Sequence, residues 1–245
     1  MTAMKVRLAQ GTPCWVSLMT SDQEGAKAFY GTLLGWEYAP GPNQLGAYVR
    51  ATLGGAKVAG IGSTPPPGGG PAEWTTYFAV DSADEVSQRV YACGGTVAVG
   101  PLQAEHAGRL AIAADVSGAV FGFWQGEDHL GWEVAGEPGA AAWTELVTPD
   151  VPGAAGFYAA VFGQEAAGSS GGTTLRVDGA AVAGVTLGEG RPRWQVHFAV
   201  GDVDLTVRQT VGLGGQVLDG PQGTPWGRVA RLADPQGGRF SVVQL

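Results

Sequence analysis

The stretch WVSLMTSD (residues 15–22) and its near-copy WTELVTPD (residues 143–150) decide the fold of this chain of 245 residues. In both, side chains alternate as in a half-buried strand, and an Asp follows where a helix is expected to begin. Each stretch begins with a tryptophan, and these two residues, Trp15 and Trp143, lie 128 positions apart. An eight-residue pattern repeated at this distance indicates that the chain contains two related halves.

The repeat continues through both halves. Trp74 recurs 120 residues later as Trp194, and Phe-Ala-Val follows each of them. Near the end of each half the offset becomes 119, and matching residues are Gly108, Arg109, Asp115 and Gly118 with Gly227, Arg228, Asp234 and Gly237. The offset changes only in loops, chiefly at the insertion TPPPGGGP, residues 64–71. We therefore predict two homologous modules, residues 1–127 and 140–245, joined by a glycine-rich linker at residues 128–139.

The same order of elements is predicted in both modules. A strand is followed by a helix, which Ser21 or Asp22 caps in the first module and Thr148 or Asp150 in the second. Gly35 is expected to end the first of these helices. Hairpin-like strand segments, a new strand carrying Phe-Ala-Val, a second helix and the closing strands complete the pattern. Each module is thus predicted as βαβββ followed by another βαβββ.

Composition excludes several classes of partner. The net charge is −8 and the 14 basic residues are scattered, which argues against nucleic acid, because unspecific affinity for phosphates needs clustered Lys and Arg. No apolar run is long enough to cross a membrane. Cys14 and Cys93 are too few for a disulfide framework. The start of the chain lacks a signal-peptide pattern. We expect a cytoplasmic monomer or homodimer whose partner is a small-molecule ligand.

The quoted residues resemble the vicinal oxygen chelate superfamily, which includes glyoxalase I, bleomycin resistance proteins, fosfomycin-modifying enzymes and extradiol dioxygenases. The resemblance rests on the strand that leads to Asp, the helix with Phe-Tyr and a closing Leu-Gly, the strand ending in Phe-Ala-Val, and the turn DPQGG (residues 234–238). It extends to two-module actinobacterial proteins called glyoxalase-like or "hydroxylase". It implies an α+β fold in which each module is a curved, mostly antiparallel sheet around a cavity.

The resemblance also implies where a metal ion would be held. Metal-dependent members use three strand positions, which here are Trp15, Thr75 and Gly122 in one module and Trp143, Gln195 and Ser241 in the other. None is His, Asp or Glu, and the single amide of Gln195 cannot hold an ion that takes three or four donors. His129 falls in the linker, where a lone histidine is expected at the surface or hydrogen-bonded. We expect no metal and no cofactor.

Strand alternation predicts which side chains face each cavity, given that the family's ligand positions do so. For the first cavity these are Trp15, Ser17, Thr75, Tyr77 and Trp124. For the second they are Trp143, Glu145, Gln195, His197 and Ser241. The tryptophans at the two strand starts are expected either to form aromatic walls for a planar ligand or to fill the space of a lost metal.

Two sets of ionisable residues are candidates for function. Glu145 and His197 are candidate general base and acid, or else a buried structural pair with Arg228. Arg109 and Arg228 occupy matching positions and are suited to anchoring a carboxylate or phosphate, or else to a salt bridge between modules. The leading hypothesis is a metal-independent protein that binds an aromatic or hydrophobic metabolite or antibiotic. The alternatives are a lyase or oxygenase-like enzyme with non-standard metal ligands, and an interaction protein with filled cavities.

Overall fold

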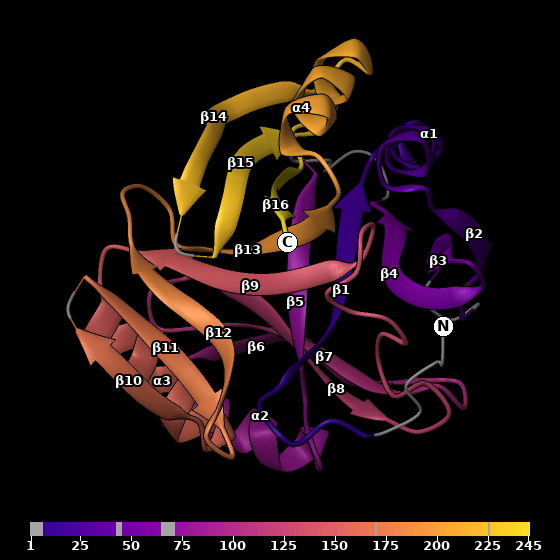
Figure 1. The fold of residues 1–245 in the computed structure, drawn as a ribbon. Coiled ribbons are helices and arrows are strands. Elements are labelled where there is room, and N and C mark those ends of the chain that lie inside the picture. Colours follow the sequence, from indigo (N-terminus) through magenta and orange to yellow (C-terminus); the bar gives the residue numbers. More distant parts are fainter. Residues whose placement is uncertain (1–6, 43–45, 65–71, 170, 225) are drawn as a thin grey trace.

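The computed structural model describes residues 7–42, 46–64, 72–169, 171–224 and 226–245 and contains two eight-stranded mixed sheets (Figure 1). The first module comprises β1 (Pro13–Thr20), α1 (Gln23–Leu34), β2 (Glu37–Pro40), β3 (Tyr48–Leu53), β4 (Ala56–Ser63), β5 (Glu73–Ala79), α2 (Ala83–Ala92), β6 (Thr96–Ala104), β7 (Gly108–Ala114) and β8 (Val120–Gly126). The second comprises β9 (Ala141–Thr148), α3 (Val151–Phe162), β10 (Glu165–Ser169), β11 (Gly172–Val177), β12 (Ala180–Leu187), β13 (Arg193–Val200), α4 (Val203–Gly212), β14 (Gln216–Thr224), β15 (Gly227–Ala233) and β16 (Arg239–Gln244). The predicted βαβββ-βαβββ order is confirmed in both modules.

The two sheets have the same topology. The strand order is β2-β3-β4-β1-β5-β8-β7-β6 in the first and β10-β11-β12-β9-β13-β16-β15-β14 in the second. Pairing is antiparallel except for β1 with β4 and β5 with β8, and for their counterparts β9 with β12 and β13 with β16. Each sheet is therefore two four-stranded units joined along β1 and β5, or along β9 and β13, which run antiparallel.

The repeated eight-residue stretch forms a strand and a helix start in both modules, as predicted. Asp22 caps α1 by accepting a hydrogen bond from the amide of Gly25 (2.9 Å), and Asp150 caps α3 through the amide of Gly153 (3.0 Å). Both helices end at a glycine in the left-handed region, where Gly35 has φ 74°. A side chain would strain this conformation, so glycine favours ending the helix there.

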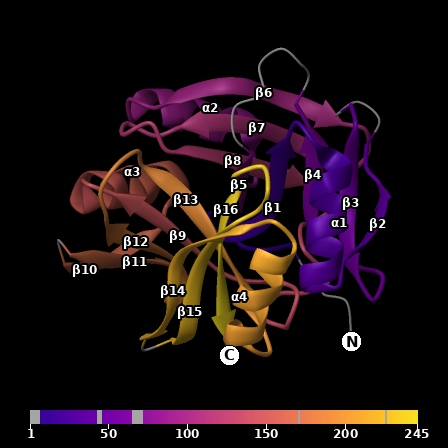
Figure 2. The ribbon, with the colours of Figure 1, turned by 90° about the horizontal axis from the view of Figure 1, so that it is seen from above.

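The helices pack between the modules rather than each on its own sheet alone. Figure 2 shows α1 beside α4 of the second module, and α3 beside α2 of the first. The ring of Phe29 in α1 lies 6.1 Å from that of Phe240 in β16. Likewise Phe157 in α3 lies 6.0 Å from Phe121 in β8. The hydrophobic cores are consequently shared, and each contains buried residues from both modules.

A hydrogen-bonded chain of Trp, Tyr and Asp connects the modules at each of these contacts. Trp74 Nε1 donates to Tyr30 Oη (3.0 Å), and Tyr30 Oη donates to Asp234 Oδ2 of the second module (2.9 Å). The repeat-related chain runs from Trp194 to Tyr158 (2.8 Å) and on to Asp115 of the first module (3.2 Å). Tyr30 and Tyr158 are fully buried.

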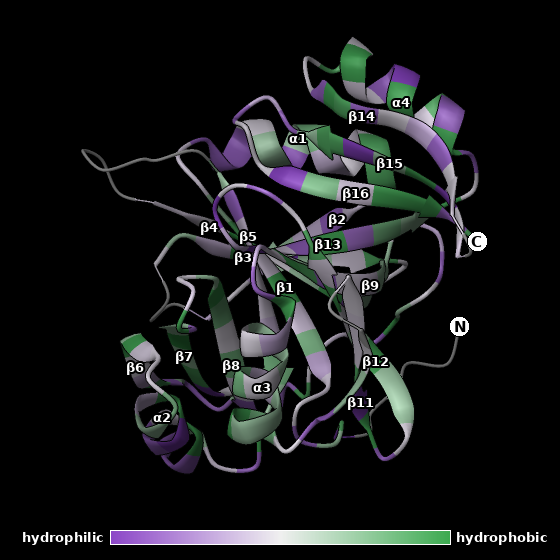
Figure 3. Ribbon diagram, turned by 90° about the vertical axis from the view of Figure 1, so that its left-hand side faces the viewer, coloured by the Kyte–Doolittle hydropathy of each residue, from purple (hydrophilic) through white to green (hydrophobic). Residues whose placement is uncertain are grey.

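The hydropathy of the helices follows their place in this arrangement. Helix α3 shows almost no hydrophilic colour in Figure 3, whereas α2 and α4 carry hydrophilic stretches on the outside. Seven of the twelve residues of α3 are buried. This helix is covered on one side by its own sheet and on the other by the first module, so it has little surface to hydrate.

Within the described part of the chain, none of the helices has the length and apolarity needed to span a bilayer. The glycine- and proline-rich insertion singled out in the sequence lies, apart from Thr64, outside the described residues.

Replacing Tyr30 by Phe tests the buried chain. The substitution keeps the ring but leaves Trp74 Nε1 without its acceptor and Asp234 Oδ2 without a donor. We expect the free energy of unfolding to fall by about 1–3 kcal/mol, the cost of leaving buried polar groups unsatisfied. Denaturant unfolding measures this. Tyr91→Phe is the control, because Tyr91 is 58% exposed; equal stabilities of the two variants would contradict a structural role for the chain.

Candidate functional site

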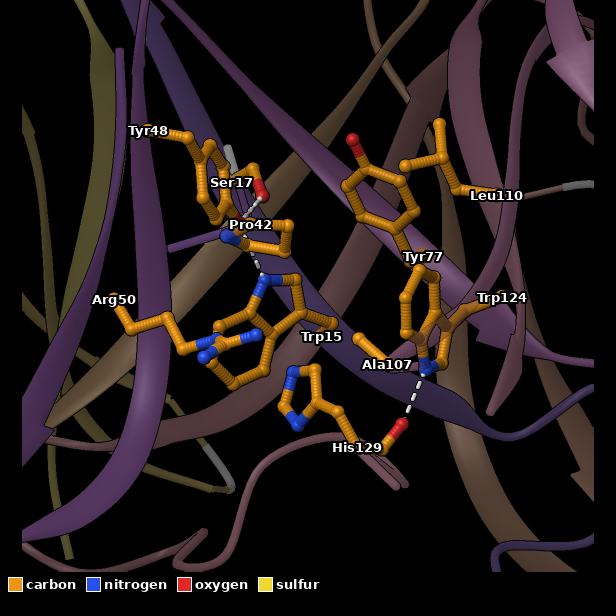
Figure 4. A pocket seen from close by; sticks show the side chains of 10 residues that line it. All are labelled: Trp15, Ser17, Pro42, Tyr48, Arg50, Tyr77, Ala107, Leu110, Trp124 and His129. Carbon is orange, nitrogen blue, oxygen red and sulfur yellow. Dashed lines mark hydrogen bonds between the residues drawn. The ribbon is translucent and has the colours of Figure 1, made fainter. Parts of the chain in front are cut away.

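The first cavity lies on the concave side of the first sheet and is walled by aromatic side chains (Figure 4). The lining residues are Trp15, Ser17, Pro42, Tyr48, Arg50, Tyr77, Ala107, Leu110, Trp124 and His129. Alternation along β1 explains why Trp15 and Ser17 face it, while Val16 and Leu18 belong to the core shared with α1. The cavity has a volume of about 40 Å³.

Tyr48 fixes one wall of this cavity. Trp15 Nε1 donates to Tyr48 Oη (2.9 Å), and the hydroxyl groups of Tyr48 and Ser17 lie 2.8 Å apart (Figure 4). The Tyr48 ring fits because Gly60 lies beneath it, where a Cβ would come within 1.7 Å of the hydroxyl oxygen. Burial raises the pKa of Tyr48, so this phenol stays protonated and available as a hydrogen-bond donor.

His129 closes the cavity from the segment that joins the modules. Its ring lies 4.6 Å from Trp15 in an edge-to-face arrangement, and its carbonyl accepts a hydrogen bond from Trp124 Nε1 (2.7 Å). The expectation of a surface or hydrogen-bonded side chain was wrong, because the ring is buried and its Nδ1 has no partner among the described residues. Burial, followed by the positive charges of Lys57 and Arg50, lowers the pKa of His129 to about 3.

The second cavity, on the concave side of the second sheet, is larger and polar. Its volume is about 220 Å³, and its lining residues are Arg193, Gln195, Leu218, Asp219, Arg231 and Arg239. Gln195 is buried and donates through Nε2 to Ser241 Oγ (2.6 Å). Trp143 lies on a neighbouring strand opposite His197 and beside Gly184.

Replacement of rings explains the difference between the two cavities. At the positions of Tyr77 and Trp124 the second module has His197 and Val243, by the repeat offsets of 120 and 119. Strand register pairs Tyr48 with Gly62 and, correspondingly, Gly172 with Thr186, so a glycine stands where the first module has Tyr48. Loss of these rings leaves the second cavity open.

Glu145 and His197 lie close together beside the second cavity. His197 Nε2 is 3.7 Å from Glu145 Oε2, and the Thr186 hydroxyl donates to Glu145 Oε1. Burial acts to raise the pKa of Glu145, but the interactions with His197 and Thr186 and the charge of Arg231 outweigh it, so the pKa lies below its ordinary value. A carboxylate held ionised beside an imidazole can accept a proton, and a catalytic role for this pair stays a prediction.

Arg109 and Arg228 do not lie at either cavity. Arg109 forms a two-point ion pair with Asp84 of α2 (2.6 and 2.9 Å), and Arg228 forms the same pair with Asp204 of α4. They lie on the helix side of β7 and β15, so they link a strand to a helix within one module. The expected salt bridge between modules was therefore wrong, and the cation that influences Glu145 is Arg231 rather than Arg228.

Several lining residues were missed by the sequence analysis. Alternation along β13 from Gln195 leads directly to Arg193, and alternation along β16 from Ser241 leads to Arg239, so both were accessible from the pattern. The roles of Tyr48 and His129 could not be predicted from the pattern, because their positions depend on strand register and on the path of the linker. Thr75 is buried opposite Ser17 in register but is not among the lining residues.

The residues at the family's metal-ligand positions do not fit a metal ion. In the first module, Trp15 and Thr75 supply no carboxylate or imidazole, and Gly122 has no side chain. A Cβ at Gly122 would lie 2.2 Å from the Tyr77 ring, so this ring occupies the space of a ligand. In the second module Gln195 and Ser241 are hydrogen-bonded to each other. No group of three or more His, Cys, Asp or Glu side chains suited to a metal occurs among the described residues.

Comparison with known proteins identifies the class. Residues 109–243 match the model of a glyoxalase-like domain, and residues 13–123 match the glyoxalase/bleomycin resistance protein/dioxygenase superfamily. The chain belongs to this superfamily. It is 41% identical over 248 residues to CFP32 of Mycobacterium tuberculosis (strain CDC 1551 / Oshkosh), which is named provisionally as a glyoxylase; the match covers 96% of this chain and 95% of CFP32. It is 40% identical over 265 residues to the anthracycline biosynthesis protein DnrV of Streptomyces peucetius. This match covers 98% of this chain and 95% of DnrV.

Solved structures share the fold at low sequence identity. The Mn(II)-bound glyoxalase from Novosphingobium aromaticivorans superimposes with a TM-score of 0.70 at 17% identity, over 96% of this chain and 82% of that one. The 2,3-dioxygenase LapB from Pseudomonas sp. KL28 superimposes with a TM-score of 0.70 at 14% identity. The match covers 98% of this chain and 94% of LapB. These similarities establish the arrangement of strands and helices.

The buried His129 predicts a pH dependence of stability. Its pKa is about 3 in the folded protein against an ordinary value of 6.5. The unfolded chain therefore binds the proton more readily, and the stability present above about pH 6.5 is lost as the pH falls toward 3. We expect wild type to lose about 3 kcal/mol more than His129→Gln between about pH 6.5 and pH 4, measured by urea unfolding. The exposed His106→Gln is the control; a variant His129→Gln that parallels wild type would contradict the burial of a neutral ring.

The side chains at the family's metal-ligand positions predict that the purified protein holds little metal. After mild chelation, purified protein should retain far less than one equivalent of Mn, Fe, Ni or Zn, because the aligned positions offer no three-donor site. Elemental analysis measures this. Stoichiometric metal that survives chelation would contradict it.

Proposed function

We propose that this protein binds a planar aromatic small molecule in the first cavity without a metal ion, for sequestration or for a step of secondary metabolism. The observation that carries the proposal is the aromatic wall of Trp15, Tyr77 and Trp124. Flat rings offer stacking and edge-to-face contacts to another ring, which aliphatic walls do not. Burial raises the pKa of Tyr77 and Tyr48, so both present neutral hydroxyl groups rather than charges.

Polar groups at the cavity give a bound ring a defined orientation. Tyr48 Oη lies between Trp15 Nε1 and Ser17 Oγ and can contact a ligand oxygen at the same place. Arg50 is the cation that lines the cavity, and none of the carboxylates in the described part of the chain lies within 4 Å of it. A phenol or quinone oxygen is a suitable partner for these groups.

The relatives support an aromatic ligand. Two proteins 40% identical to this chain, DnrV and DauV of Streptomyces, are named for anthracycline biosynthesis, and anthracyclines contain fused aromatic rings. The shared chemistry is a flat ring system carrying oxygen substituents. For this chain the same class of ligand is part of the proposal.

The small volume of the first cavity favours a second candidate. About 40 Å³ holds roughly three water molecules, so a fused ring system enters only if lining side chains move apart. The second candidate is an interaction protein with filled cavities, in which Trp15 and its neighbours occupy the space that metal-binding relatives use. The protein would then act through its surface.

Titration with 1,8-dihydroxyanthraquinone distinguishes the two candidates. Binding predicts saturable quenching of tryptophan fluorescence, and a loss of at least about tenfold in affinity, or ~1.4 kcal/mol, in Trp15→Ala. Trp143→Ala is the matched control at the equivalent strand position, and it should bind as wild type does. Calorimetric titration confirms the fluorescence result.

Further variants separate lost contacts from unfolding. Tyr48→Phe keeps the ring and removes only the hydroxyl, so it should weaken binding severalfold without lowering the melting temperature substantially. If neither the wild type nor any variant responds to the quinone, while Trp15→Ala is destabilised by about 3–5 kcal/mol as for a large buried ring, the filled cavity is correct and the binding proposal is wrong.

A further inference from the structure

Three arginine side chains converge on the second cavity. Arg193 begins β13, Arg239 begins β16, and Arg231 lies on β15 opposite Ser241. All three stand on strand positions that face the concave side, in the same alternation as Gln195 and Ser241. The cavity of about 220 Å³ is open enough for these guanidinium groups to reach a molecule inside it.

Positive charge in this cavity is only partly neutralised. Asp219 pairs with Arg231. Arg193 donates from Nη1 to the carbonyl of Arg191 (3.4 Å), and its buried Nε has no partner among the described residues. Arg239 forms no ion pair or side-chain hydrogen bond with any residue that the structure describes. Burial and then the charges of Arg239 and Arg231 lower the pKa of Arg193, which reflects the cost of holding these cations together.

The cluster is not a requirement of the fold. At the positions of Arg193, Arg231 and Arg239 the first module has Glu73, Ile112 and Val120, in the same strand register. The Arg231–Asp219 pair is replaced there by Ile112 opposite Val99. Both modules fold alike, so the fold itself does not require the three arginines. In a chain of net charge −8, three arginines on one concave face form a local reversal of charge.

We propose that the second cavity binds the oxyanion group, carboxylate or phosphate, of a small metabolite. Arg193 and Arg239 hold the anion from two sides, and Arg231 shares its charge between the anion and Asp219. The planar guanidinium fork matches both oxyanions with paired hydrogen bonds. This site does not depend on the aromatic ligand proposed for the first cavity.

The surroundings limit the size and charge of the ligand. The volume accommodates a small molecule, and the buried amide of Gln195 provides a further polar contact. Glu145, ionised and within electrostatic reach of Arg231, repels an anion that goes deeper. The anionic group therefore stays near the arginines, and a neutral or cationic remainder of the ligand points toward Glu145 and His197.

Calorimetric titration with inorganic phosphate and with malonate, in a low-salt buffer free of both, tests the site. Neither probe has an aromatic ring, so binding in the first cavity does not contribute. We expect saturable binding of at least one probe with a stoichiometry of one. The tighter of the two identifies the kind of oxyanion, and both results support the site.

Substitutions locate the binding. Arg193→Gln and Arg239→Gln should each weaken it at least about tenfold, whereas Asp219→Asn should strengthen it about threefold by freeing Arg231. Arg228→Gln is the matched control, because Arg228 lies on the same strand as Arg231 but on the helix side, paired with Asp204. It removes the same charge and should leave binding unchanged.

Two outcomes would overturn the site. One is the absence of saturable binding of both probes to wild type at millimolar concentration. The other is equal weakening by Arg193→Gln and Arg228→Gln, which would indicate only a response to net charge. The increase in affinity expected from Asp219→Asn distinguishes a lost contact from a folding defect, because a misfolded protein does not bind more tightly.

Discussion

The hydrogen-bonded chain from Trp74 through Tyr30 to Asp234 is the contact on which the arrangement of the modules depends. A buried phenol needs both its donor and its acceptor role satisfied, and here one partner comes from each module. The second chain, through Tyr158, repeats the constraint with the modules exchanged. Helices α1 and α3 are therefore held between the sheets, and neither module has a core that is complete without the other.

Placing the folding contacts on the helix side leaves the concave faces free to diverge. The two sheets have the same strand order and register, yet one concave face carries aromatic rings and the other arginines and acidic groups. Substitution of Tyr48, Tyr77 and Trp124 by smaller or polar equivalents opens the second cavity without touching the shared core. Duplication followed by divergence on one face explains how a single fold holds two unlike cavities.

The metal-ligand positions of the superfamily show the same divergence at the level of single residues. Gly122 is required by the Tyr77 ring that crosses it, so the loss of a ligand and the gain of an aromatic wall are one structural change. In the second module, Gln195 lines the arginine-lined cavity and donates a hydrogen bond to Ser241. Membership of the superfamily therefore does not by itself assign the metal chemistry of its metal-dependent members to this chain.

The sequence by itself determined the duplication, the order of strands and helices, the helix caps and the missing metal ligands, because repeats, alternation and capping are local patterns. Only the tertiary structure decided that Asp115 and Asp234 bind tyrosines of the opposite module, that Arg109 and Arg228 pair with helices, and that His129 closes the first cavity. These contacts join residues separated by many positions and depend on strand register, on the path of the linker and on how two curved sheets pack together, which no local pattern encodes.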